Sequence, residues 1–336
     1  MNVDVTYRRA RGAAVVLAAA FTLASCAGSP PPVRTTETGA GPTFVDVEGA
    51  QVVLADFKTS AFPYHGIAPN SEHPELAKPF MDVDQDGRLG HTSPRGGLLW
   101  EDTTYSDRRV LLAAANDFDP RRGGAIVVFF HGNQATLERD VLERQQLVRQ
   151  LSESQLNGVL VAPQLAVDAL DSSAGNFWRP GAFAQFLDEA EAKLSSLYPG
   201  APRGTFRRMP VYIVAYSGGY LPAAYSLSGG GAGERVRGVV LLDAVYGEED
   251  KWVDWIESAR SHAFFVSAYS KSSRDGNDSL RARLEKDGLK PDTTLPDALG
   301  PGVVAFVDSG DVEHNDFVNV AWTSDPLKDI FGRMVR

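Results

Sequence analysis

Short apolar runs alternate with amphipathic stretches along most of the chain, and this alternation predicts strands followed by helices. Continuous apolar runs, typical of strands covered on both faces, lie at 126–130, 159–162, 211–214, 263–266 and 303–307, and the segment 236–242, interrupted by Arg237 and Gly238, predicts a further strand. Apolar residues three or four positions apart predict a helix that ends near Ser154, helices at 181–197 and 250–259, and a closing helix that begins at Asp325 and Pro326. Strands that alternate with helices imply right-handed crossovers, so we predict an α/β fold, a three-layer sandwich around a mostly parallel sheet.

The first part of the predicted domain follows a different pattern. Segments 52–57 and 109–114 are β-rich and are separated by turn-rich sequence, which predicts a leading antiparallel portion. Between them, Asp82, Asp84 and Asp86 precede a glycine and copy the first half of a calcium-binding loop. Ser93 stands where such a loop has its glutamate, and no flanking helices are evident. We therefore predict an acidic, solvated turn and no metal site, with the three carboxylates as the alternative, a structural cation site.

Charge and cysteine content narrow the class of protein. The 336 residues carry a formal net charge of −10, and this excess of acid argues against a nucleic-acid surface, which needs Lys and Arg patches. The apolar and charged fractions, 43% and 23%, are ordinary for a globular protein. Cys26 is the single cysteine, so no disulfide can form within the chain.

The N-terminus has the composition of an export signal. Three arginines within positions 8–11 precede an uncharged apolar run at 13–23, which is too short to span a bilayer core of about 30 Å. The run ends in Leu23-Ala24-Ser25-Cys26, which resembles the lipobox of bacterial lipoproteins. The resemblance implies that residues 1–25 are a signal peptide and that Cys26 is lipidated. The alternative is a plain signal peptide with an incidental cysteine.

The lipobox resemblance also implies a location. The protein would be exported and anchored to the cell envelope by its N-terminal lipid. Ala27 stands where an inner-membrane retention signal has Asp, which favours the outer membrane, facing the periplasm, in an organism with two membranes. Residues 26–42 are rich in Pro, Gly and Thr and cannot bury a core, so we predict a flexible tether. Residues 43–336 then form a single domain.

A serine motif follows the strand predicted at 211–214. The segment Ala215-Tyr216-Ser217-Gly218-Gly219 resembles the G-x-S-x-G nucleophile elbow of the α/β-hydrolase family, with alanine in place of the first glycine. The serine of such an elbow sits on a strained strand-to-helix turn, so the residues two positions away on either side must be small. The resemblance extends from about Ala125 to the C-terminus and implies that Ser217 is a nucleophile. The alternative is a structural glycine-rich turn.

The family order of serine, acid and histidine identifies the partners that Ser217 would have. Of the six histidines, only His262 and His314 follow Ser217. His262 precedes a strand and should lie at the wrong edge of the sheet, whereas His314 follows the last strand, so we predict His314 as the base. Asp243 directly follows the strand at 236–242 and is the favoured acid, with Asp275 as the alternative acid.

The loop after the strand at 126–130 is the expected second wall of the site. Its His131-Gly132-Asn133 resembles the HG segment of the family, which implies that the backbone amides of Asn133 and Gly218 bind the oxyanion. His131 is expected to brace this loop. Segments 164–180, with Phe177 and Trp178, and 269–277 also follow strands. Their aromatic residues could line a pocket or serve only in packing.

These features together predict a serine hydrolase. The family resemblance implies cleavage of carboxylic esters through an acyl-enzyme, with a small-molecule or lipid ester as substrate and no cofactor. Two alternatives belong to other classes: an amidase that acts on cell-wall or lipid amides, and a non-catalytic binding lipoprotein on the same scaffold. A surface interaction protein that uses the Asp-rich turn is a further alternative.

Overall fold

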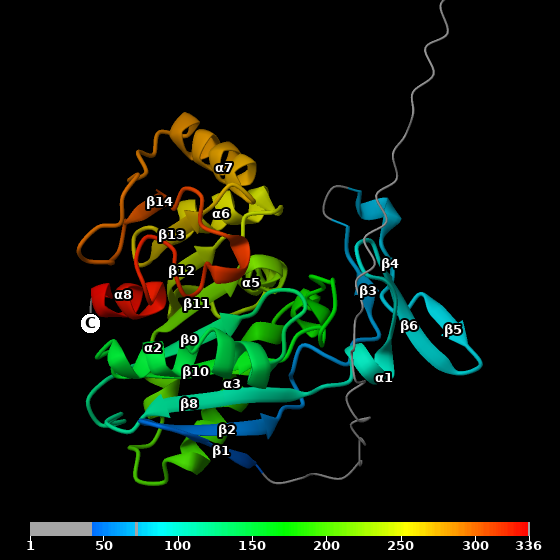
Figure 1. Cartoon of the computed structure of the whole chain (residues 1–336), viewed down its shortest axis with the longest axis horizontal. Coiled ribbons are helices and arrows are strands. Elements are labelled where there is room, and N and C mark those ends of the chain that lie inside the picture. The colour runs from blue at the N-terminus through cyan, green and yellow to red at the C-terminus, as the bar shows by residue number, and fades with distance from the viewer. Residues whose placement is uncertain (1–41, 71–72, 335–336) are drawn as a thin grey trace, which may run out of the picture. The chain divides into compact units, whose positions relative to one another are not determined.

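The computed structural model describes residues 42–70 and 73–334 (Figure 1). The predicted signal peptide, Cys26 and the tether up to residue 41 lie outside the described residues. The described residues form one compact unit. None of the described helices has both the length and the apolar character needed to cross a membrane.

A nine-stranded sheet organises this unit, in the order β1-β2-β8-β10-β9-β11-β12-β13-β14 (Figure 1). The first strands are antiparallel, as predicted: β1 (Thr43–Val47), β2 (Ala50–Asp56), β8 (Arg109–Ala115) and its neighbour β10 (Gly158–Pro163). From β10 onward all pairs are parallel, through β9 (Ala125–Phe130), β11 (Val211–Tyr216), β12 (Val236–Leu242), β13 (Phe264–Tyr269) and β14 (Val304–Asp308).

Helices cover both faces of the sheet. Ile126, Val128 and Phe130 of β9 belong to one buried cluster and Val127 and Phe129 to the other, because successive side chains of a strand point to opposite faces. The first cluster includes residues of α3 (Ala182–Leu197), α5 (Tyr220–Ser228), α6 (Glu249–Ala259) and α7 (Arg274–Lys286). The second includes residues of η2 (Leu137–Arg144), α2 (Leu147–Glu153) and α8 (Pro326–Arg333). The predicted three-layer α/β sandwich around a mostly parallel sheet is therefore confirmed.

An insertion lobe (residues 57–108) separates β2 from β8. Its two small antiparallel sheets consist of β3 (Ile67–Ala68) with β4 (Lys78–Pro79), and of β5 (Val83–Gln85), β6 (Arg88–Ser93) and β7 (Gly97–Trp100). Short helical turns complete the lobe at η1 (Pro74–Leu76) and α1 (Glu101–Thr104). Phe62, Phe80 and Tyr105 are fully buried and pack against one another, and they belong to the same buried cluster as one face of the central sheet, so the lobe shares its core with the rest of the domain.

Three local predictions differ from the structure. The helix predicted to end near Ser154 is two pieces, η2 with π-helical geometry and α2, separated at Gln146, whose φ of 51° is left-handed. Both pieces bury the same face in one cluster, so the apolar spacing continues across the break and conceals it. The position of Asp278, two residues before Leu280, predicts a helix N-cap, but Asp278 lies inside α7, which begins at Arg274. Asp325 occupies the N-cap position of α8, but its side chain makes no capping hydrogen bond.

Candidate active site

Ser217 stands at the carboxyl end of β11, where the strand turns sharply into a helix. Its φ of 51° is left-handed, and the turn η4 (Ser217–Gly219) leads directly into α5. A Cβ on Gly219 would lie 2.2 Å from the carbonyl oxygen of Phe130, and a Cβ on Gly132 would lie 2.9 Å from the Cβ of Ser217. Glycine is therefore required at both positions, because the elbow presses against the end of β9.

His314 reaches Ser217 from the loop after β14. Its Nε2 lies 2.8 Å from Ser217 Oγ, and its Nδ1 lies 2.6 Å from Asp243 Oδ2. An ionised carboxylate only accepts hydrogen bonds, so Nδ1 carries the proton and Nε2 is free to accept from the serine hydroxyl. Tyr216 stacks on the imidazole, with ring centroids 5.1 Å apart, and donates its hydroxyl to the His314 carbonyl oxygen at 2.7 Å. The ring is thus held in orientation from three sides.

Asp243 is fully buried, and its φ of 47° turns it out of the end of β12. Burial by itself raises the pKa of this carboxyl, but hydrogen bonds from His314, from serine hydroxyls and from a backbone amide outweigh it and hold the pKa well below its usual value. The alternative acid, Asp275, lies exposed in the first turn of α7. Asp243 is therefore the carboxylate that meets His314.

Three serines that the sequence reasoning missed surround Asp243. Ser270 donates to it through both its amide (3.0 Å) and its hydroxyl (2.9 Å), and the hydroxyls of Ser272 and Ser273 lie at 2.5 and 2.6 Å. All three belong to the turn after β13, the strand next to β12. Clustered serines just after a neighbouring strand were the sequence signal for this arrangement.

The predicted oxyanion residues lie side by side. A Cβ on Gly218 would lie 2.1 Å from Asn133 Oδ1, so the end of the β9 loop faces the start of the elbow. The amide of the next residue, Gln134, donates to the Ala169 carbonyl oxygen at 2.8 Å. Ser172, another residue that sequence reasoning missed, donates its hydroxyl to Asn133 Oδ1 at 3.1 Å. The loop after β10 therefore holds the Asn133 side chain in place.

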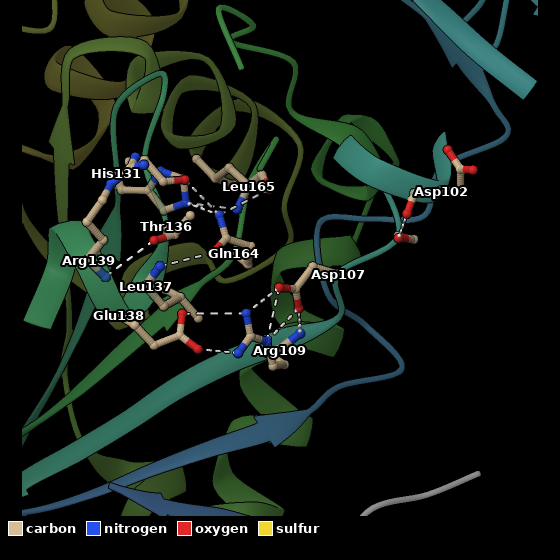
Figure 2. A network of polar contacts seen from close by, with 12 residues as sticks. Asp102, Asp107, Arg109, His131, Thr136, Leu137, Glu138, Arg139, Gln164 and Leu165 are labelled. Atoms are coloured by element: carbon tan, nitrogen blue, oxygen red, sulfur yellow. Dashed lines mark hydrogen bonds and ion pairs between the residues drawn. The ribbon is translucent and has the colours of Figure 1, made fainter. Parts of the chain in front are cut away.

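His131 braces this wall from beneath (Figure 2). It is fully buried, its Nδ1 contacts the Gly132 carbonyl oxygen at 2.8 Å, and its Nε2 accepts from the Leu165 amide at 2.9 Å. Burial lowers the pKa of His131 to about 4, so the ring is neutral at pH 7. Gln164 links the same ring to the start of η2, because its Oε1 accepts from the Leu137 amide at 3.0 Å.

Aromatic residues near the site divide into core and surface groups. Phe177 is 1% exposed and packs against Phe130 and Phe186, so it fills the core and does not line a pocket. Tyr246, in contrast, is 42% exposed, and its ring centroid lies 6.3 Å from that of His314. Burial of the hydroxyl raises the pKa of Tyr246 to about 12, so it remains protonated and can hydrogen-bond to Ser272 Oγ at 2.7 Å.

The Asp-rich segment forms a β-hairpin between β5 and β6. Asp86 and Gly87, with φ of 54° and 85°, are the two turn residues, a dipeptide typical of tight hairpins. Asp84 accepts from the Gly87 amide at 2.8 Å, and Asp82 accepts from Lys78 Nζ at 2.6 Å and from the Thr92 amide at 2.7 Å. Within residues 42–70 and 73–334, no group of three ligating side chains is placed to hold a metal ion.

The sequence matches no protein-family model and no curated protein. Similar solved structures include a feruloyl esterase module from Clostridium thermocellum, with 13% identity, a TM-score of 0.43 and coverage of 82% of this chain and 94% of that one. An S-formylglutathione hydrolase from Agrobacterium tumefaciens has 12% identity, a TM-score of 0.44 and coverage of 86% and 95%. A cold-adapted esterase from an Arctic intertidal metagenomic library has 11% identity, a TM-score of 0.47 and coverage of 89% and 100%. The chemistry proposed below rests on the geometry of the site itself.

Proposed function

We propose that this protein is a serine hydrolase that cleaves carboxylic esters through an acyl-enzyme. The observation that carries the proposal is the continuous hydrogen-bonded series from Ser217 Oγ through His314 to Asp243, with links of 2.8 and 2.6 Å. A hydroxyl is a weak nucleophile by itself and needs a base within hydrogen-bond reach, oriented by a third group. These three side chains meet that requirement at the carboxyl edge of the sheet.

The reaction proceeds in two halves. In the first, Ser217 Oγ attacks the ester carbonyl carbon while His314 Nε2 takes the serine proton, and the negative carbonyl oxygen lies against the amides of Gly218 and Asn133. His314 then gives the proton to the leaving alcohol as the C–O bond breaks. In the second half, His314 takes a proton from water, whose oxygen attacks the acyl carbon. Collapse of that intermediate releases the carboxylic acid, and the proton returns to Ser217.

A serine-directed fluorophosphonate probe and a panel of 4-nitrophenyl esters of increasing acyl length test the proposal. We expect the probe to label the folded wild type, and Ser217→Ala to abolish labelling and lower kcat/KM by about 10³-fold or more. Ser261→Ala changes an exposed serine outside the candidate active site and is the matched control. It should retain both probe labelling and ester hydrolysis. A folded wild type that neither labels nor hydrolyses any ester would overturn the proposal in favour of a binding role.

We also propose that the mature protein is held at a bacterial membrane by lipid on Cys26. The support is the sequence alone: a positive region, a short apolar run and a cysteine in a lipobox-like context. Radiolabelled palmitate fed to an expressing bacterium should enter the wild type and not Cys26→Ala. A wild-type chain that is exported without label would show that the segment is a plain signal peptide.

A further inference from the structure

A cavity opens at the amino ends of β11, β12 and β13. Its volume is about 440 Å³, and it is bordered by Pro210, just before β11, and by the segment 299–301, just before β14. Ser217 lies beyond the opposite end of β11, which is six residues long, so roughly 20 Å of strand lies between them (Figure 1). The cavity is therefore separate from the candidate active site.

Two stacked aromatic rings line the cavity. Tyr212 and Phe264 both lie opposite Gly238 in the strand register, and their ring centroids are 5.7 Å apart with 25° between the planes. A Cβ on Gly238 would lie 2.3 Å from the Phe264 ring, so glycine is what allows the two rings to meet across β12. Met209 and Leu299 contribute further apolar atoms to the lining. It suits a flat apolar group, because aromatic rings prefer stacked or edge contacts with one another.

Cationic side chains border the same cavity, although the chain as a whole has a net charge of −10. Three arginines line it, Arg208, Arg235 and Arg237, and among the described lining residues none is acidic. Arg235 is already paired with Glu191. Arg208 and Arg237 donate instead to backbone carbonyl oxygens, at 3.0 and 3.4 Å. A guanidinium has five N–H donors, so both arginines keep their charge and spare donors for an anion.

We propose that this cavity binds a small carboxylate carried on a flat aromatic ring. The planar fork of a guanidinium matches the two oxygens of a carboxylate, and the Tyr212–Phe264 pair provides the surface on which the ring packs. The volume falls within the roughly 300–1,000 Å³ of small-molecule sites in proteins. The proposal does not depend on the chemistry of Ser217, because the cavity shares no lining residue with that site.

Isothermal titration calorimetry of the full chain with four probes tests this assignment. Phenylacetate combines the ring and the charge, phenylacetamide keeps only the ring, and acetate and inorganic phosphate keep only a charge. We expect phenylacetate to bind with one site per chain and each of the other three to bind at least tenfold more weakly. Arg237→Gln should weaken phenylacetate binding at least tenfold.

Two variants are controls, and a third repeats the test at another arginine of the cavity. Arg207→Gln removes the same charge from α4 (Thr205–Arg208) at an exposed residue that does not line the cavity, and Ser217→Ala alters the other site; both should bind phenylacetate like the wild type. Arg208→Gln, at another exposed arginine that lines the cavity, replaces Arg237→Gln if that variant does not fold, and it should also weaken phenylacetate binding. Binding unchanged by both cavity variants, binding lost in Ser217→Ala, or phosphate or phenylacetamide bound as tightly as phenylacetate would each overturn the proposal.

Discussion

At Asp243, two carboxylate oxygens accept hydrogen bonds from three serines and one histidine. Oδ1 accepts from the Ser270 amide and the Ser273 hydroxyl, and Oδ2 accepts from Ser270, Ser272 and His314. A buried carboxylate without partners would be neutral, because desolvation disfavours its charged form. Here the donors keep Asp243 ionised, and in the proposed reaction this fixed negative charge stabilises the imidazolium that forms when His314 takes the serine proton.

Replacing that carboxylate by an amide tests its role with little change in shape. We expect Asp243→Asn to lower kcat for ester hydrolysis by about 10³- to 10⁴-fold, because the amide no longer fixes the productive tautomer of His314. Asp275→Asn, the matched change at the alternative acid, should alter kcat by less than about twofold. A larger loss in Asp275→Asn than in Asp243→Asn would reverse the assignment of the acid.

Among the elements, α8 begins where Asp325 and Pro326 predict, but a residue of another helix caps it. The carboxylate of Asp325 binds the guanidinium of Arg149, at 2.5 Å for the closer contact. The helix is capped instead by Gln150 of α2, whose Oε1 accepts from the amides of Leu327 and Lys328 at 2.9 and 3.3 Å. Gln150 is fully buried and donates Nε2 to two backbone carbonyl oxygens. One side chain therefore joins α2 to α8.

Gln150→Leu should destabilise the protein far more than a change at Asp325. The substitution leaves buried amides and carbonyls without partners, at about 1–3 kcal/mol for each group that water cannot reach, so we expect a loss of about 3 kcal/mol. Asp325→Asn breaks a partly exposed ion pair and should cost about 1 kcal/mol or less. Urea unfolding measures both. Equal losses of unfolding free energy, or a larger loss for Asp325→Asn, would show that Asp325 stabilises α8 at least as much as Gln150 does.

At the scale of the whole molecule, the strand order creates the candidate site. Ser217, Asp243 and His314 follow β11, β12 and β14, and because these strands are parallel, all three residues emerge at one edge of the sheet. His314 lies 97 residues from Ser217 in the sequence, yet the two side chains are within hydrogen-bond distance. The core beneath them also contains a buried neutral histidine, His131, which links the stability of the molecule to pH.

Stability should fall as the solution is acidified through the range in which unfolded His131 gains a proton. Burial lowers the pKa of His131 to about 4 from an unfolded value of 6.5, so between these pH values the unfolded chain binds more protons than the folded one. This contribution is complete above pH 6.5 and is lost as the pH falls toward 4, a change of about 3 kcal/mol.

Urea unfolding of wild type and His131→Asn across pH 4–7 measures that change. The difference in unfolding free energy between the two proteins should be largest near neutral pH and shrink toward pH 4, because only the wild type carries this histidine. Ser261→Ala changes an exposed serine that carries no charge and should leave the pH slope of the wild type unaltered. A difference that is constant with pH would mean that His131 does not couple protonation to folding.

Features that depend on neighbours along the chain could be predicted before the fold was known. Apolar runs identified the central strands, because a strand buried on both faces needs an unbroken apolar stretch whatever surrounds it. The small residues around Ser217 predicted the sharp turn, because a left-handed serine at a strand end excludes bulk nearby. Ser217, His314 and Asp243 each follow a predicted strand, and they were predicted to share one site because parallel strands present their carboxyl ends at one edge of the sheet.

Features that depend on residues far apart in sequence became clear only from the packing of separate elements. Asp243 and Asp275 each follow a neighbouring strand, and the choice between them depended on where the loop after β14 returns to the sheet edge. The serines around Asp243, the capping of α8 by Gln150 and the break at Gln146 leave the local pattern unchanged. Such hydrogen bonds form where packing brings separate elements together, and no periodicity in the chain encodes which elements will meet.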